Sequence, residues 1–134
     1  LGRLTENIIT TSNGKFVSKT TMAYDAFGND TLICIYEDES TVSRKEYRDF
    51  DAEGNVVELN AYNSLGMLLT QETYKYDKEG NMTEKCVYSG YSALAEKSII
   101  RYEGYDWCGN YRRAYLYDKD SSLIGGNFRD LEYY

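Results

Sequence analysis

Short runs of β-branched and aromatic residues recur along the chain, and Gly, Asn or Asp bound each run. Residues 31–36 and 56–62 are the clearest examples, and their composition is typical of β-strands. In the run 42–50, charged residues occupy both alternating faces, whereas a sandwich needs one clean apolar face. The pattern therefore predicts an all-β protein built as a single twisted or curling sheet.

A tandem motif, Tyr-Asp-x-x-Gly-Asn, separates these runs. Near-intact copies begin at Tyr24, Phe50, Tyr76 and Tyr105, so successive copies start 26, 26 and 29 residues apart. Another tyrosine stands twelve residues after each start and opens a degraded copy: these are Tyr36, Tyr62, Tyr88 and Tyr117. Such self-similarity indicates a repeat architecture in which one supersecondary unit recurs.

The chemistry of the motif explains its period. An Asp at the first corner of a type I turn accepts hydrogen bonds from main-chain amides, and a Gly in the left-handed conformation closes the hairpin with a bulge. The residues assigned to these structural turns are Asp25, Gly28, Asp51, Gly54, Asp77, Gly80, Asp106 and Gly109. We therefore expect one domain over residues 1–134, an antiparallel up-and-down meander of about ten strands of about 8 residues.

Two segments depart from this rhythm. Residues 92–97 lie in a stretch three residues longer than its counterparts, and we expect a helical turn or a longer loop there. Gly125, Gly126 and Asn127 are interpreted as a last turn, followed by an edge strand or cap over residues 128–134.

The four motif copies carry a family resemblance. Tyr-Asp-x-x-Gly-Asn with strand-like spacers over residues 10–120 resembles the YD repeat, also called the RHS repeat, of bacterial surface and secreted proteins. The resemblance implies a continuous β-sheet, which in long members spirals into a shell, and some members are described as carbohydrate-binding. This chain is too short for a closed shell, and it lacks the family's terminal core region and a following toxin-like domain. We expect an extracellular or cell-envelope location and, because the chain begins at Leu1, a trimmed native start.

The charge balance argues against anionic partners. The chain has 15 Lys and Arg against 22 Asp and Glu, a net charge of -7, so phosphate backbones and anionic membranes repel it. It contains no histidine, the commonest general base and transition-metal ligand. No apolar run approaches the roughly 20 residues of a transmembrane helix. We expect no catalytic residue, metal site, cofactor, nucleic-acid partner or membrane insertion.

The candidate ligand-binding residues are Tyr105, Trp107 and Tyr111. Trp107 is the only tryptophan and stands in a turn, and aromatic side chains offer an apolar ring with a polar handle to glycans and proteins. The competing interpretation is structural, with Trp107 folded back onto the sheet. The turn aspartates likewise form turns or, alternatively, a row of weak calcium sites.

The cysteines are expected to be free thiols. Cys34 and Cys86 each stand ten residues after a motif start, which makes them small buried hydrophobes on equivalent strands, whereas Cys108 lies in a turn.

The functional hypothesis is a non-catalytic cell-surface or secreted repeat module that binds a protein or glycan partner or acts as a scaffold. One alternative is a glycan-active enzyme that uses paired turn carboxylates with a raised pKa. Another is an edge-to-edge assembly module, or a fragment of a larger repeat shell, that self-associates through its terminal edge strands.

Overall fold

The computed structural model describes residues 3–90 and 96–128, and no helix occurs within these ranges. The chain is all-β, as the sequence predicts. Its ten strands are β1 (Leu4–Thr10), β2 (Phe16–Tyr24), β3 (Asp30–Tyr36), β4 (Val42–Phe50), β5 (Val56–Asn63), β6 (Leu68–Tyr76), β7 (Met82–Ser89), β8 (Glu96–Glu103), β9 (Arg113–Tyr117) and β10 (Leu123–Phe128).

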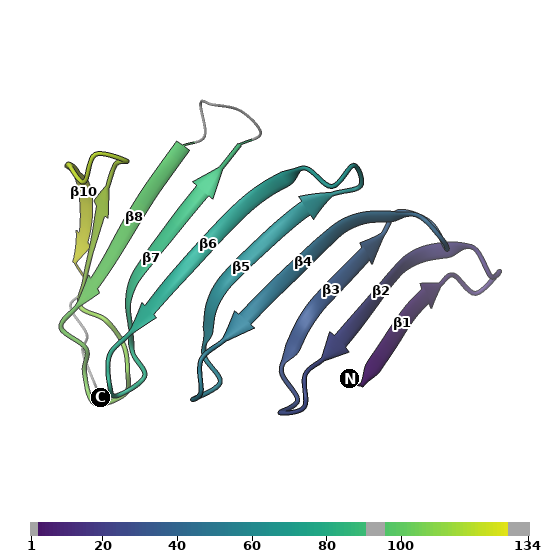
Figure 1. Cartoon of the computed structure of the whole chain (residues 1–134), viewed down its shortest axis with the longest axis horizontal. Helices are drawn as coiled ribbons and strands as arrows, with labels where there is room; N and C mark the ends of the chain where they lie inside the picture. The colour runs from purple at the N-terminus through teal and green to yellow at the C-terminus, as the bar shows by residue number, and fades with distance from the viewer. Residues whose placement is uncertain (1–2, 91–95, 129–134) are drawn as a thin grey trace. The chain divides into compact units, whose positions relative to one another are not determined.

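The strands form one antiparallel sheet in which each strand lies beside its neighbours in the chain, in the order β1 to β10 (Figure 1). Since β1 and β10 are the two ends of this order, the sheet is an open meander, which confirms the predicted single sheet of about ten strands. The chain divides into two compact units, Leu1–Gln71 (unit 1) and Glu72–Tyr134 (unit 2), with the division inside β6.

The four motif copies form one type of turn, here called the repeat turns (residues 25–29, 51–55, 77–81 and 106–110). In the first, the Asp25 main-chain N–H donates to the Asn29 carbonyl oxygen at 2.9 Å, and the Gly28 N–H donates to the Asp25 carbonyl oxygen at 3.2 Å. Asp25 Oδ1 accepts from the main-chain N–H groups of Phe27 and Asn29, each at 2.9 Å. Gly28 has a φ of 93°, which a residue without a Cβ adopts at no steric cost.

The motif's last residue completes this turn. The Asn29 side-chain amide donates to Asp25 Oδ2 at 3.0 Å, and this bond lowers the pKa of the Asp25 carboxyl. Asn55 lowers the pKa of Asp51 in the same way. Each of these aspartates is therefore held in its charged form by donors from its own turn.

The degraded motif copies that Tyr62 and Tyr117 open have the same main-chain turn, and so does the connection between β1 and β2. Residues 11–15, 63–67 and 118–122 repeat both main-chain hydrogen bonds, although the motif is altered there. Ser121 holds the glycine position in the last of them, at a φ of 62°. The connection 37–41 differs, because Asp38 Oδ1 accepts from the N–H groups of Ser40 and Thr41, and these bonds lower the pKa of Asp38 to about 2.

The expectation of a last turn at Gly125, Gly126 and Asn127 is wrong. These residues lie in β10, where Gly126 pairs with Tyr115 of β9. A Cβ at position 126 would lie 3.3 Å from the Ala114 carbonyl oxygen, so close backbone approach is the reason that glycine suits this strand.

The two remaining loop expectations fall mostly on residues that the structure does not describe. Of the segment 92–97, residues 92–95 lie outside the described ranges, and residues 96 and 97 open β8 rather than a helical turn. Phe128 ends β10, and the remainder of the predicted terminal segment, residues 129–134, also lies outside them.

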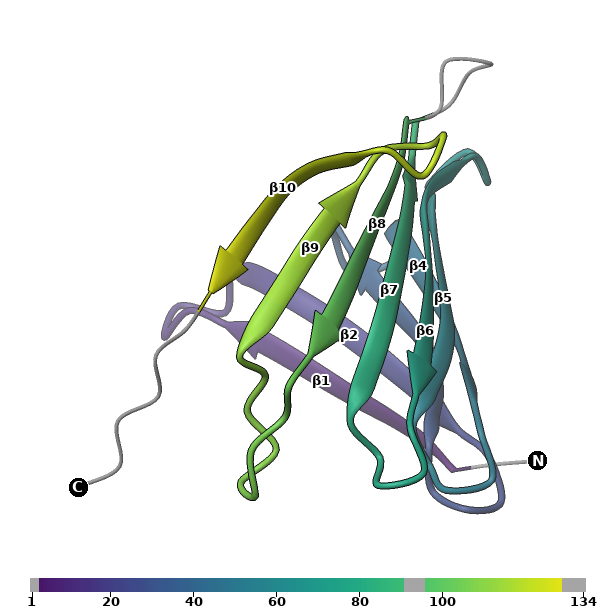
Figure 2. The ribbon, with the colours of Figure 1, turned by 90° about the vertical axis from the view of Figure 1, so that its left-hand side faces the viewer.

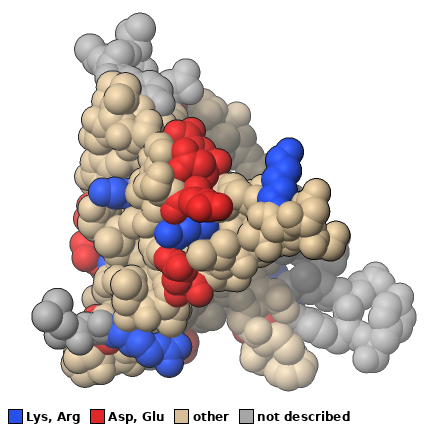
Figure 3. Space-filling view, turned by 90° about the vertical axis from the view of Figure 1, so that its right-hand side faces the viewer, with Lys and Arg blue, Asp and Glu red and all other residues tan. Residues whose placement is uncertain are grey.

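Few described side chains are buried in either unit, because a single sheet layer exposes both faces. In unit 1 these are Ile33, Cys34 and Ala61. Glu46 lies directly opposite Ile33 on one side and Ala61 on the other. Its carboxylate pairs with Arg44 at 2.8 Å and with Arg48 at 3.4 Å. Charged side chains with long stems therefore cover the apolar residues of this face. Figure 3, which views the molecule from the side on which β1 lies in Figure 1, shows acidic and basic groups side by side on the surface.

In unit 2, strands β7 to β10 lie side by side (Figure 2). The buried Ile99 of β8 faces Cys86 of β7 and Tyr117 of β9, and the Arg101 guanidinium lies over the Tyr117 ring at 4.7 Å. All three cysteines are free thiols: Cys34 is buried, Cys86 half-buried and Cys108 exposed.

Candidate aromatic binding site

The candidate residues Tyr105, Trp107 and Tyr111 belong to the connection between β8 and β9, which contains the fourth repeat turn. The Arg112 N–H donates to the Glu103 carbonyl oxygen at 3.1 Å, and Gly104 has a φ of 67°. The chain therefore bends before and after the repeat turn.

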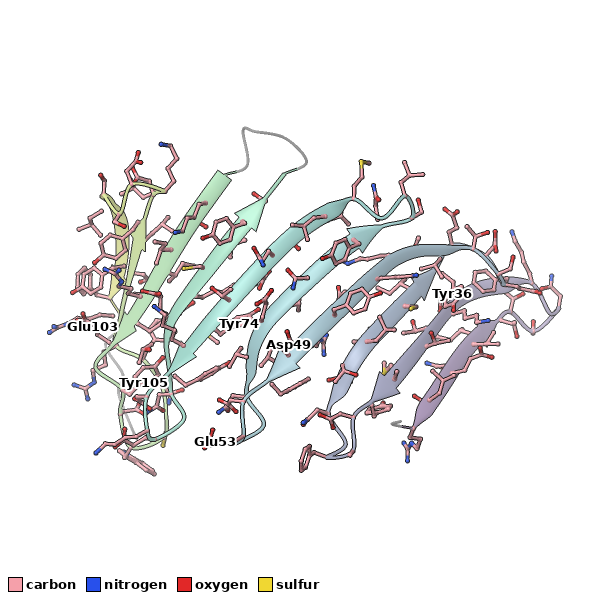
Figure 4. The ribbon with its side chains drawn as sticks, in the orientation of Figure 1. Tyr36, Asp49, Glu53, Tyr74, Glu103 and Tyr105 are labelled. Atoms are coloured by element: carbon pink, nitrogen blue, oxygen red, sulfur yellow. The ribbon has the colours of Figure 1, made fainter. Side chains whose placement is uncertain are left out.

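A hydrogen bond holds Tyr105 against the neighbouring strand β7. Its hydroxyl donates a hydrogen bond to the main-chain carbonyl oxygen of Met82, the first residue of β7, and its side chain is labelled in Figure 4. Burial raises the pKa of Tyr105, and electrostatic interaction with Tyr102 and Asp77 raises it further. Tyr105 is therefore a neutral hydrogen-bond donor near neutral pH, and its ring has a fixed position.

Tyr111 packs against another tyrosine. Its ring and that of Tyr102 in β8 have centroids 4.9 Å apart and planes inclined by 57°, a favourable tilted arrangement for two aromatic rings. Both side chains are half-buried.

These rings line an open hollow of about 390 Å³ in unit 2, here called the tyrosine hollow. Its wall includes Tyr76, Asn81, Met82, Tyr102, Tyr105 and Tyr111. The volume falls within the range of small-ligand sites. Four phenol rings in one concavity offer apolar faces for stacking as well as hydroxyl groups that donate and accept hydrogen bonds.

The third and fourth repeat turns meet at the mouth of this hollow. A Cβ on Gly109 would lie 3.5 Å from Asn81 Oδ1, and the Asn81 side-chain amide is itself fixed by Asp77 Oδ2 at 3.1 Å. The main-chain hydrogen bond from Asn81 lowers the pKa of Asp77. The rim of the hollow therefore includes Gly109 and the side chain of Asn81, which the hydrogen bond to Asp77 holds in place.

Trp107 lies outside the tyrosine hollow. Its side chain is 85% exposed at the fourth repeat turn, and it does not contribute to the wall of the hollow. The three candidate residues therefore do not form one exposed platform: two line a hollow, and the third stands on the turn beside it.

Tyr76 and Tyr102 were not singled out as binding residues from the sequence. Tyr76 opens the third motif copy as Tyr105 opens the fourth, so the repeat itself is a signal that could have paired them. Tyr102 has no such signal, because its place beside Tyr111 depends on how the chain bends after β8.

A second aromatic concavity, of about 830 Å³, lies in unit 1. Tyr47 and Tyr62 contribute to it, with ring centroids 5.8 Å apart in an edge-to-face arrangement. Lys45 and the exposed Leu65 of the 63–67 turn also line it.

The pKa shifts of the turn carboxylates bear on the enzymatic alternative. That alternative needs a carboxyl group with a raised pKa. Seven carboxyl groups have a pKa below the ordinary value: Asp25, Asp38, Asp51, Glu58, Asp77, Glu84 and Asp106.

The described residues contain no group of three His, Cys, Asp or Glu side chains that could hold a metal ion. They also contain no helix with the length and apolar character needed to cross a membrane.

Comparison with known proteins assigns no family to the chain. No protein-family model matches the sequence, and no curated protein matches it significantly.

Proposed function

We propose that this chain is a non-catalytic YD-repeat module of the cell surface or extracellular space that binds a glycan or protein partner through the tyrosine hollow and Trp107. The observation that carries the proposal is the convergence of four tyrosines on one hollow beside an indole that is 85% exposed. The extracellular placement is supported by the motif's resemblance to surface and secreted repeat proteins.

The chemistry of the hollow suits recognition rather than reaction. A phenol ring presents a flat apolar face and a hydroxyl group, and it loses little conformational entropy when a ligand immobilises it. Tyr105 and Tyr111 already have fixed positions through Met82 and Tyr102. A ligand that stacks in the hollow therefore meets a preorganised surface, which lowers the cost of binding.

The single tryptophan provides a direct test. Glycan and protein arrays probed with the chain should yield ligands that shift or quench Trp107 fluorescence on titration. We expect Trp107→Ala and Tyr111→Ala to weaken binding by roughly tenfold each, as for aromatic anchors at other interfaces; the affinities of the variants are measured by titration calorimetry, because Trp107→Ala removes the fluorophore. The matched control is Leu65→Ala, since Leu65 is also an apolar turn residue, 79% exposed, but belongs to unit 1.

Two results would count against this proposal. Array ligands that bind with unchanged affinity to both aromatic variants would place recognition elsewhere on the chain. Turnover of a bound glycan, detected as new reducing ends, would support the enzymatic alternative instead.

The open edges of the strand order favour a second function, assembly. β1 exposes Leu4 by 70% and Ile8 by 49%, and β10 exposes Leu123 and Ile124 by 60% each. No residue of β10 is charged, whereas edge strands that avoid association usually carry charges. We propose that these strands pair edge to edge with further strands, of the same or another chain.

Assembly through the edges predicts a concentration-dependent mass. In sedimentation velocity, we expect oligomers at high concentration and a monomer for Ile124→Lys, because an edge lysine opposes strand addition. Lys119→Ala, in the adjoining exposed turn, is the control. A monomer at all concentrations would contradict self-assembly, and equal oligomers in both variants would exclude β10 as the contact.

A further inference from the structure

A hollow of about 960 Å³ lies in unit 1 between the first and second repeat turns. Its wall includes Phe27 from the first turn, and Phe50, Asp51 and Glu53 from the end of β4 and the second turn. This hollow, here called the phenylalanine hollow, belongs to the other unit from the tyrosine hollow and has a different chemistry.

Phe27 is the most exposed large apolar side chain among the described residues, at 92%. Its place in the turn does not require an aromatic residue, because the same position holds Glu53 and Glu79 in the next two copies. The turn's hydrogen bonds use only the main chain of this residue. Phe27 therefore presents a bare ring to solvent at the mouth of the hollow.

The charges around this ring are negative. Asp49 and Glu53, both labelled in Figure 4, line the hollow and are exposed, and neither carboxylate has a hydrogen-bond or ion-pair partner within residues 3–90 and 96–128. The single cation in the wall, Arg48, is already paired with Asp30 at 2.7 Å and Glu46 at 3.4 Å.

In the third repeat turn, the glutamate at the position equivalent to Glu53 has an ion-pair partner. Glu79 is paired with the adjacent Lys78 at 3.3 Å. The second turn has Ala52 where the third has Lys78, so Glu53 lacks the local cation. An external cation can take that place beside Glu53.

We propose that the phenylalanine hollow receives a lysine or arginine side chain of a partner protein. The aliphatic stem and cationic head would lie on the Phe27 ring, a cation–π contact, while Glu53 and Asp49 supply the opposite charge. The net charge of -7 attracts a basic partner from a distance. This inference goes beyond the proposed function and does not depend on the tyrosine hollow.

The test is a titration of the ¹⁵N-labelled chain with a hexalysine and a hexa-arginine peptide, followed by NMR. We expect amide shifts centred on residues 25–29 and 51–55, with a dissociation constant that rises with salt. Phe27→Ala should weaken binding roughly two- to fivefold, and Glu53→Gln by a similar factor. Trp107→Ala should leave the binding unchanged.

The matched control is Glu79→Gln, which removes the same formal charge from an equivalent turn position. If Glu79→Gln weakens binding as much as Glu53→Gln does, the attraction is diffuse and the site is refuted. Shifts centred away from the first two repeat turns would also refute it. Shifts of residues 25–29 and 51–55 by a neutral oligosaccharide such as cellohexaose, without any effect of the basic peptides, would reassign the hollow to glycans.

Discussion

Ile33→Ala should lower the free energy of unfolding by about 2–4 kcal/mol, the usual loss when a buried isoleucine is truncated to alanine. Ile33 is 8% exposed, one of three buried hydrophobic residues among residues 3–71. It lies opposite Met22 on one side and Glu46 on the other. A single sheet layer has no second sheet that could move inward and fill the space.

Ile35→Ala is the matched control for this experiment. Ile35 is the same residue type on the same face of the same strand, two positions further on, but it is 38% exposed. Its truncation should cost less than about 1 kcal/mol. Both values come from urea unfolding followed by circular dichroism. Equal losses of unfolding free energy in the two variants would mean that the burial of Ile33 does not contribute to the stability of unit 1 beyond what a part-exposed isoleucine contributes.

The buried residues of unit 1 also show how a chain with little apolar burial keeps one fold. Glu46 has only 15% of its side chain exposed, and its partners Arg44 and Arg48 remain partly in water. Such part-exposed pairs contribute little energy individually. The aliphatic stems of these side chains, however, remove apolar surface from water. They cover part of the sheet face that a second sheet would cover in a β-sandwich.

The strand order could be predicted because the turn chemistry is local. Asp25 and Gly28 act within five residues of one another, so their spacing in the sequence already contains the geometry. Open meander topology then follows from tandem hairpins.

The wrongly predicted segment, residues 125–127, owes its structure to pairing with the neighbouring strand and not to its local composition. Gly125 and Gly126 have a composition typical of a turn, but their strand is determined by Leu116 and Tyr115 of β9. Ser121 stands at the glycine position of the copy that Tyr117 opens and adopts a glycine-like φ of 62°, although the residue type gives no sign of it.

The candidate site was predictable only in part, for the same reason. Tyr105 and Tyr111 do line one hollow, but the contact between Tyr111 and Tyr102 spans the connection between β8 and β9, whose path the motif does not specify. The exposure of Trp107 follows from its turn position. The motif does not specify the direction in which each side chain points. The sequence therefore could not show whether these residues form an exposed platform or line a hollow.

The second large effect is expected at a glycine of the repeat turns. Gly80→Val should lower the free energy of unfolding by about 2 kcal/mol, because a β-branched residue strongly disfavours a left-handed backbone conformation. Gly80 has a φ of 83°, and a Cβ there would meet no atom within 4 Å. The loss would therefore measure backbone strain without a steric clash.

Two further variants separate backbone strain from other effects of the substitution. Glu79→Val changes the neighbouring exposed residue, whose φ is not positive, and should alter stability by no more than about 0.5 kcal/mol. Ser121→Gly makes the reverse change at the equivalent position of the last turn and should stabilise the chain by about 1 kcal/mol. If neither Gly80→Val nor Ser121→Gly changed the free energy of unfolding, the left-handed backbone conformation at this turn position would not contribute to the stability of the chain.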